Sequence, residues 1–296
     1  MSEPTPKIGK FKASTMLGKA AWRTLKLDKE MLMASVLSML AGVVLFGIFV
    51  AALIFTMPEG FLTDENVTAS GDVSYYLLLA AYLFVTYLIT NYFSGAIAHA
   101  ALTRFRGGDP TLKGSLQAAS AKFGPLAAFS GVQATVGLIL NILEERLPLA
   151  GKIATWIAGA AWGIATMFVI PLIMDGKETR PLKAVKASAG TFTKVWGESI
   201  FIGIGLGIIQ VIFTLLMIFF LAGTLVAAIS LSSWALGIAG ASIFIVVVVL
   251  AAIIMSTLRT IVMTAAYYYA STQQLPTGFD DELVRVMFRP KKKWLQ

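Results

Sequence analysis

Four neutral polar residues stand inside long apolar runs of this sequence, where chemistry within a membrane would be sought. They are Asn91, Gln133, Asn141 and Gln210. Ion-coupled pumps usually place an ionisable group near the membrane midplane, since burying a charge there costs at least about 2.5 kcal/mol and persists only where it is used. None of these four residues ionises. They are therefore candidates for lining the path of a small or lipidic solute.

Enzymatic signatures are missing from the sequence. The single histidine, His99, has neither a second histidine nor a nearby carboxylate with which to form a metal site or an acid–base pair. Cysteine is absent, and there is no H-E-x-x-H, activated G-x-S-x-G or P-loop motif. The GIGLG segment at 203–207 lies within an apolar run, without the strand and turn of a dinucleotide site. We expect no enzymatic activity, cofactor or metal.

Six apolar runs must position any site in this chain, which has 57% hydrophobic and 14% charged residues. A hydrocarbon core about 30 Å thick needs roughly 20 helical residues. The sequence therefore predicts an all-α polytopic membrane bundle of six transmembrane helices. The predicted spans are Leu32–Thr56, Tyr75–Ala101, Pro125–Leu143, Ile153–Met174, Ser199–Leu221 and Leu236–Leu258.

The cations are distributed unevenly between these runs. Of the 24 Lys and Arg residues, 22 fall in the two termini and in alternate gaps, and only Arg146 and Lys152 fall in the other gaps. Because short cytoplasmic loops retain Lys and Arg, both termini are predicted to be cytoplasmic in a multi-pass protein of the cell membrane. The net charge of +8 is then an orientation signal, and no nucleic-acid partner is expected.

Three of the cytoplasmic segments predict amphipathic helices, each ahead of two spans. One lies near residues 16–27, one follows Asp109 as N-cap and Pro110, and one begins near Pro181. A basic face opposite an apolar face is typical of helices in the lipid headgroup plane. The candidate contacts to anionic headgroups are Lys19, Arg23, Lys26, Lys113, Lys183, Lys186 and, at the end of the last span, Arg259.

Some residues near the cytoplasmic ends carry further expectations. Asp28 interrupts the apolar side of the first amphipathic segment, and Asp175 is expected to pair in water with Lys177 or Lys194. Tyrosines 267–269 are expected at the membrane interface, where amphipathic rings gather. The chain divides into a cytoplasmic segment 1–30, a membrane domain 31–269 and a basic tail 270–296.

Small residues suggest how the spans associate. Gly159 and Gly163 in the fourth span, and Gly203 and Gly207 in the fifth, have the four-residue spacing that lets backbones approach closely. We expect these two spans to pack together, although a glycine-lined conduit is the alternative. The unit of an amphipathic helix and two spans recurs three times. This recurrence indicates either internal repetition or independent pressures on the same topology.

A resemblance is carried by the segment VIPLIMDGKETRPLKAVKASAGTFTKVWGE. Its distinguishing positions are Pro171, Pro181, Ser188, Trp196, Gly197 and Glu198. It resembles a family of uncharacterised prokaryotic six-helix integral membrane proteins, which are distantly similar to the membrane domain found beside glycerophosphodiesterase domains. The resemblance covers about Trp22 to Tyr269, and it implies fold and topology but no reaction.

Two functional hypotheses follow from these patterns. The first is a non-enzymatic membrane organiser or accessory subunit, which binds anionic lipid through its basic helices and a membrane protein partner or a second copy through its bundle. The alternative is a transporter or channel for a small or lipidic solute, with the four neutral polar residues along the path.

Overall fold

The computed structural model describes the backbone of residues 10–57, 73–196 and 201–279, and the side chains of 18–57, 73–193 and 213–279. Every regular element in these ranges is a helix, and six helices are long and apolar enough to cross a membrane. The predicted all-α, six-span membrane bundle is therefore confirmed.

The six spans are longer than predicted. They are formed by α2 (Glu30–Thr56), α3 (Val73–Phe105), α5 (Phe123–Arg146), α6 (Leu149–Thr166) continued by α7 (Val169–Met174), α9 (Phe201–Ser230) and α10 (Trp234–Thr272). The 39 residues of α10 extend over roughly 58 Å, about twice the thickness of the hydrocarbon core. The last part of α10 therefore continues beyond a single membrane crossing.

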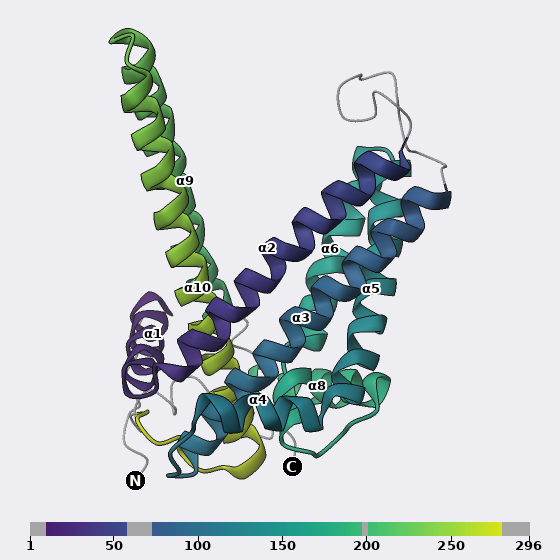
Figure 1. Ribbon diagram of the computed structural model, residues 1–296. Coiled ribbons are helices and arrows are strands. Elements are labelled where there is room, and N and C mark those ends of the chain that lie inside the picture. The colour runs from purple at the N-terminus through teal and green to yellow at the C-terminus, as the bar shows by residue number, and fades with distance from the viewer. Residues whose placement is uncertain (1–9, 58–72, 197–200, 280–296) are drawn as a thin grey trace.

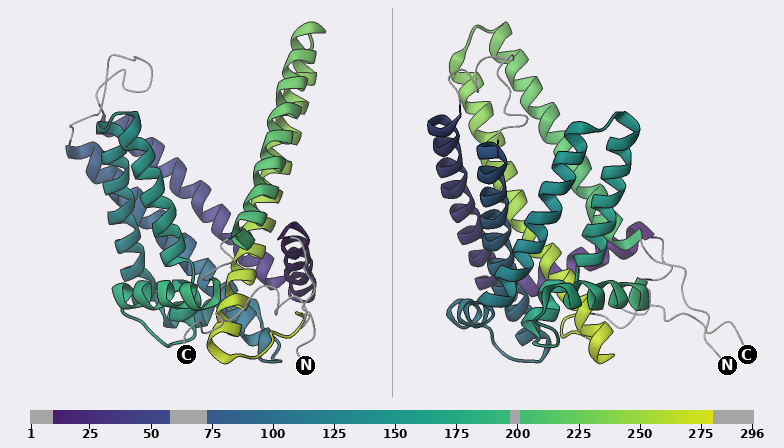
Figure 2. Two further views of the ribbon diagram at one scale, coloured as in Figure 1. Left: turned by 180° about the vertical axis from the view of Figure 1, so that it is seen from behind. Right: turned by 90° about the vertical axis from the view of Figure 1, so that its right-hand side faces the viewer.

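Three short helices gather at one end of the long ones. They are α1 (Lys10–Leu27), α4 (Leu112–Ala121) and α8 (Pro181–Trp196), and α1 and α8 run across the axes of the spans (Figures 1 and 2). We call this end the amphipathic end and the opposite one the distal end. The N-cap of α4 is Thr111, whose hydroxyl accepts from Gly114 N at 3.1 Å, and not Asp109 as predicted.

The hydrophobic core lies at the amphipathic end. Its fully buried large side chains include Met31, Leu102, Phe129, Phe168 and Tyr267, from α2, α3, α5, the α6–α7 junction and α10. The apolar faces of the three short helices join this core through buried residues, which are Ala20, Ala21, Leu25, Ala119 and Ala184. These faces were predicted to lie in the headgroup plane. Part of each face packs on the ends of the spans, which removes it from water. The position of these helices relative to the lipid headgroups stays a prediction.

The fourth span is broken where Pro171 prevents a continuous helix. Proline has no backbone N–H, and its ring clashes with the carbonyl four residues earlier, here that of Met167. α6 accordingly ends at Thr166, and α7 begins at Val169. At the break, Phe168 N donates to the fully buried Oγ of Ser188 at 3.0 Å, which attaches α8 to the span.

Two groups of spans separate toward the distal end. The α9–α10 hairpin rises apart from α2, α3, α5 and α6, and the groups meet at the amphipathic end (Figures 1 and 2). There, the hydroxyls of Ser35 in α2 and Thr257 in α10 are hydrogen-bonded at 2.6 Å. Across the described residues α6 packs mainly on α5 and α8, and α9 on α10 and α1. The structure thus differs from the predicted close packing of the fourth and fifth spans, since each packs on its sequence neighbour.

Candidate functional site

A nearly enclosed ion pair joins the first two helices to the end of α3. Asp28, between α1 and α2, is 2% exposed and receives two hydrogen bonds from the Arg104 guanidinium, the Nε one at 2.7 Å. The same guanidinium donates to Asp109 at 2.6 Å. Asp28 thus interrupts an apolar face because it binds Arg104, which is 76 residues away and was not anticipated as its partner.

A second cluster forms around Asp175, directly after α7. Its carboxylate pairs with the Arg106 guanidinium, accepts a hydrogen bond from the Tyr267 hydroxyl at 2.8 Å, and has Lys177 Nζ at 3.5 Å. The predicted pairing with Lys177 is confirmed, but Arg106 and Tyr267 make the shorter contacts. The ring of Tyr267 is buried, as is that of Tyr268. Both rings thus pack against protein, and the prediction that they lie at the level of the membrane interface stays a prediction.

The electrostatics of Asp175 follow from these neighbours. Its enclosed position would by itself raise the pKa of the carboxyl, but the hydrogen bond from Tyr267 and the hydrogen bond and charge of Arg106, with the charge of Lys177, more than offset it. The net pKa of Asp175 lies below its ordinary value of 3.8. The carboxylate is therefore ionised at neutral pH and ties α7, the end of α3 and α10 together.

The cations predicted to contact lipid headgroups differ from Arg104 and Arg106, which are paired with carboxylates. Lys19, Arg23 and Lys26 of α1, Lys113 of α4, and Lys183 and Lys186 of α8 are all exposed, and so is Arg259 on α10. Among the side chains that the structure describes, none of these seven forms an ion pair with a carboxylate. Lys26 lies over the ring of Trp22 at 5.8 Å from its centroid. The amphipathic end thus presents cations whose charges are not neutralised within the described chain.

Of the four neutral polar residues in the spans, two are in contact, Asn91 and Gln133. The Asn91 amide donates to Gln133 Oε1 at 2.6 Å and to Ser130 Oγ at 2.8 Å, which connects α3 to α5. Asn141 is eight residues past Gln133, roughly 12 Å along α5. Its Oδ1 is buried and has no hydrogen-bond partner in the described chain. The side chain of Gln210 lies outside the described residues.

Of the four glycines predicted to let spans pack closely, only one faces a neighbouring helix among the described side chains. A Cβ on Gly159 would lie 3.7 Å from Leu140 Cδ1, so this glycine faces α5, whereas Gly163 has no neighbour within 4 Å. The surroundings of Gly203 and Gly207 lie outside the described residues. A packing role for this second pair stays a prediction. No group of three or more His, Asp or Glu that could hold a metal occurs among the described residues.

Comparison with known families gives one result. Residues 73–279, which are 207 of the 296 residues, match the model of a family of unknown function, DUF6159. The match extends from the start of α3 to the segment after α10 and gives no link to glycerophosphodiesterases. Neither the curated proteins nor the solved structures yielded a match. The expected resemblance to an uncharacterised family is confirmed in this form: the chain belongs to the DUF6159 family of unknown function.

Proposed function

We propose that this protein is a non-enzymatic membrane organiser or accessory subunit whose amphipathic end binds anionic lipid headgroups. The observation that carries the proposal is the contrast between two sets of cations. Arg104 and Arg106 are held by carboxylates, whereas the seven headgroup cations are exposed and have no carboxylate partner among the described residues. A Lys or Arg near an anionic membrane surface contributes about 1 kcal/mol of binding.

The orientation belongs to the same proposal. With the amphipathic end in the cytoplasm of the cell, the basic helices face the leaflet that carries anionic lipid. In this orientation Arg146 and Lys152, at the distal end, lie on the extracellular side of the membrane. Exposed apolar side chains beside the cations, such as Trp22 and Leu182, would enter the interface while the lysines remain at the phosphates.

The second component of the proposal is a membrane protein partner or a second copy of this chain. Many large apolar side chains are exposed along both groups of spans, and a second membrane protein or a second copy would cover part of them. Cross-linking in native membranes, followed by identification of covalently attached chains, tests this component. Recovery of the protein only as a monomer would contradict it.

Lipid retention tests the central claim. The full chain, purified in mild detergent, is incubated with equal amounts of phosphatidylglycerol and phosphatidylcholine, and the bound lipids are counted by native mass spectrometry. We expect a preference for phosphatidylglycerol that declines as salt rises, because screening weakens exposed charges. Replacing Lys19, Arg23 and Lys26 together by Gln should reduce the preference about tenfold or more.

The control uses cations at the other end of the molecule. Arg146→Gln with Lys152→Gln removes two exposed positive charges at the distal end. These changes should leave the preference for phosphatidylglycerol unaltered. An equal loss of preference in both variants, or no preference in the native protein, would contradict the proposal.

A transporter or channel for a small solute is the second candidate, and Asn141 is the observation that favours it. A buried amide oxygen without a partner costs about 1–3 kcal/mol, which a bound solute or water could offset. Asn141→Leu should then abolish flux in vesicles loaded with a panel of uncharged solutes. Asn91→Leu, at another of the four polar positions, should in addition lower the free energy of unfolding, because Asn91 bonds to α5.

A further inference from the structure

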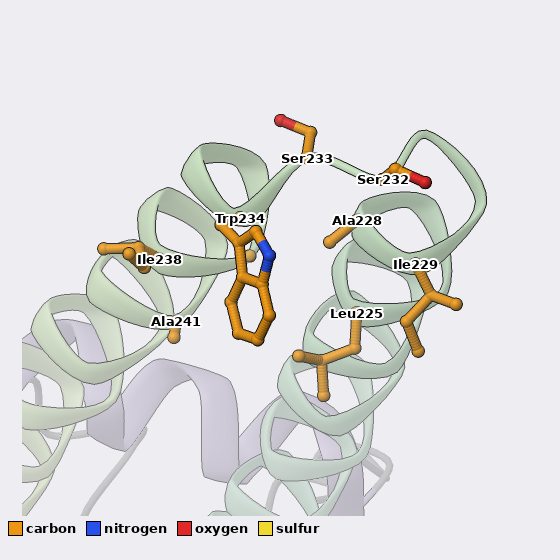
Figure 3. A pocket seen from close by; sticks show the side chains of 9 residues that line it. Leu225, Ala228, Ile229, Ser232, Ser233, Trp234, Ile238 and Ala241 are labelled. Carbon is orange, nitrogen blue, oxygen red and sulfur yellow. The ribbon is translucent and has the colours of Figure 1, made fainter.

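A cavity of about 510 Å³ lies at the distal end of the α9–α10 hairpin. Figure 3 shows Trp234 and Ala241 of α10 and Leu225 of α9 turned toward the space between the two helices. The remaining lining comes from Ala228, Ile229, Ser232, Ser233, Gly237 and Ile238. This volume falls within the range of about 300–1,000 Å³ that small-molecule sites occupy.

The chemistry of the cavity changes along its length. The wall is apolar, and its polar end is formed by the indole N–H of Trp234 and the turn at Ser232 and Ser233. The two serine hydroxyls point away from the space between the helices in Figure 3, and that of Ser233 accepts from Leu236 N as the N-cap of α10. Trp234 is 88% exposed, and its N–H donates to no residue of the described chain. An apolar wall below a polar rim complements the part of a phospholipid where the ester groups meet the acyl chains.

The surroundings identify what can reach this cavity. Residues 213–258 contain no Asp, Glu, Lys or Arg, and both helices expose apolar side chains along this stretch. The cavity is therefore continuous with the membrane-facing surface of the hairpin. A charged or strongly polar ligand would find no counter-charge there, whereas bilayer lipid surrounds it at high concentration.

Close helix packing next to the cavity gives it a fixed wall. A Cβ on Gly240 would lie 2.6 Å from Thr224 Cβ, and a Cβ on Gly237 would lie 3.4 Å from Ala228 Cβ. At these two glycines the backbone of α10 approaches α9 closely. Trp234 and Ala241 come from the same part of α10, so this contact also fixes their spacing from Leu225.

We propose that this cavity binds one acyl chain of a bilayer phospholipid, with the ester groups at Trp234 and the serine turn. This site is at the opposite end from the headgroup cations, and it does not depend on the proposed function. Its ligand is retained by apolar contact and by the indole N–H, so retention should be insensitive to salt and to the charge of the headgroup.

A photoactivatable lipid tests the proposal. The full chain is placed in phosphatidylcholine nanodiscs containing phosphatidylcholine with a diazirine midway along one acyl chain, and cross-links are located by mass spectrometry. We expect residues 225–241 to be labelled about tenfold more per residue than residues 243–250, a preference of about 1.4 kcal/mol. The second stretch is an internal reference, because it exposes Ile243, Ile245, Val246 and Leu250 to the same bilayer.

Filling the cavity from either wall should remove the labelling. Ala241→Phe fills it from α10 and Leu225→Trp from α9, and both should reduce labelling of 225–241 to the level of the reference stretch. Ala252→Phe adds the same bulk as the first variant on an exposed surface of α10 outside the cavity, and it should change nothing. Circular dichroism and size-exclusion elution confirm that each variant is folded.

Three outcomes would overturn the proposal. Equal labelling of the two stretches in the native protein shows that the lipid is not specifically bound, whatever the variants do. Retained labelling in both filled variants shows that the cavity is not the site. Cross-links from 225–241 to a second protein chain in place of lipid show that another copy occupies it. The Lys19, Arg23 and Lys26 variant should label normally, which separates this test from that of the proposed function.

Discussion

The amphipathic end and the α9–α10 arm, residues 213–258, are both rich in apolar residues but are stabilised differently. At the amphipathic end, side chains from α1, α2, α3, α5, α7, α8 and α10 enclose one another, as in a water-soluble domain. Along the arm, two helices pack together and expose Leu, Ile, Val and Phe over most of their length. The first region is held by protein contacts, and the second depends on lipid to cover it.

The ionic contacts follow the same division. Asp28 and Asp175 lie at the amphipathic end and connect helices distant in sequence, whereas the arm contains no ionisable side chain of the types that form such pairs. The difference indicates that the amphipathic end sets the arrangement of the spans. Four comparisons, from the largest expected effect to the smallest, test this division.

The same substitution in the two regions should have very different costs. Phe129→Ala empties a site that is 1% exposed in the core, and we expect a loss of about 3–5 kcal/mol in the free energy of unfolding. Phe219→Ala in the arm, where the ring is 77% exposed, should cost less than about 0.5 kcal/mol. Denaturant titration in detergent micelles measures both. Equal losses would contradict the division.

The two carboxylates that share Arg104 provide a second comparison. Asp28→Asn leaves the Arg104 guanidinium, which is 22% exposed, without its main counter-charge, and we expect a loss of about 2–3 kcal/mol in the free energy of unfolding. Asp109 is 88% exposed, so Asp109→Asn should cost less than about 1 kcal/mol. Thermal unfolding of the two variants side by side gives the difference. A larger loss in the Asp109 variant would show that the enclosed pair is not the important one.

Removing the hydrogen bond that attaches α8 to the fourth span should destabilise the protein by an intermediate amount. Ser188→Ala removes the hydroxyl that accepts from Phe168 N, and it should lower the free energy of unfolding by about 1–2 kcal/mol. Thr193→Ala, on the same helix, removes an exposed hydroxyl whose bond is local, to Gly190 O, and serves as the control. Hydrogen exchange of the α6–α7 junction should rise in the first variant only.

The smallest of the four expected changes in the free energy of unfolding comes from protonation of Asp175 at low pH. Because the folded pKa of Asp175 is depressed, its contribution is present above the ordinary pKa of 3.8 and is lost as the pH falls through the folded value. The free energy of unfolding, measured from pH 6 to pH 3, should therefore fall less steeply for Asp175→Asn than for the native protein. Parallel curves would show that Asp175 has the same pKa in both states.

Several features of the structure could be predicted from local sequence. Runs of apolar residues locate all six spans because each long helix needs its own stretch, and the basic and apolar faces identify α1, α4 and α8. The glycine positions were less informative. Gly159 faces α5, because spacing shows that a backbone can approach closely without showing which helix will approach it.

The site is less predictable than the fold. The exposed cations were identifiable because a solvated face needs no particular partner. Lys177 was also identifiable as a partner of Asp175, because it is only two residues away. The pairings of Asp28 with Arg104 and of Asp175 with Arg106 were not, because both arginines were assigned to the cytoplasmic surface by the charge pattern that sets orientation. A buried tyrosine such as Tyr267 could be placed only with the helices around it known.

The sequence alone determined that this chain is a six-span helical membrane protein with three basic amphipathic helices, since hydropathy and helical period act over one or two dozen neighbouring residues. Only the tertiary structure decided that the short helices bury their apolar faces at one end. It alone also decided that Asp28 meets Arg104, and that the α9–α10 arm stands apart with a cavity at its tip. These features depend on contacts between residues far apart in the chain, for which local patterns carry no signal.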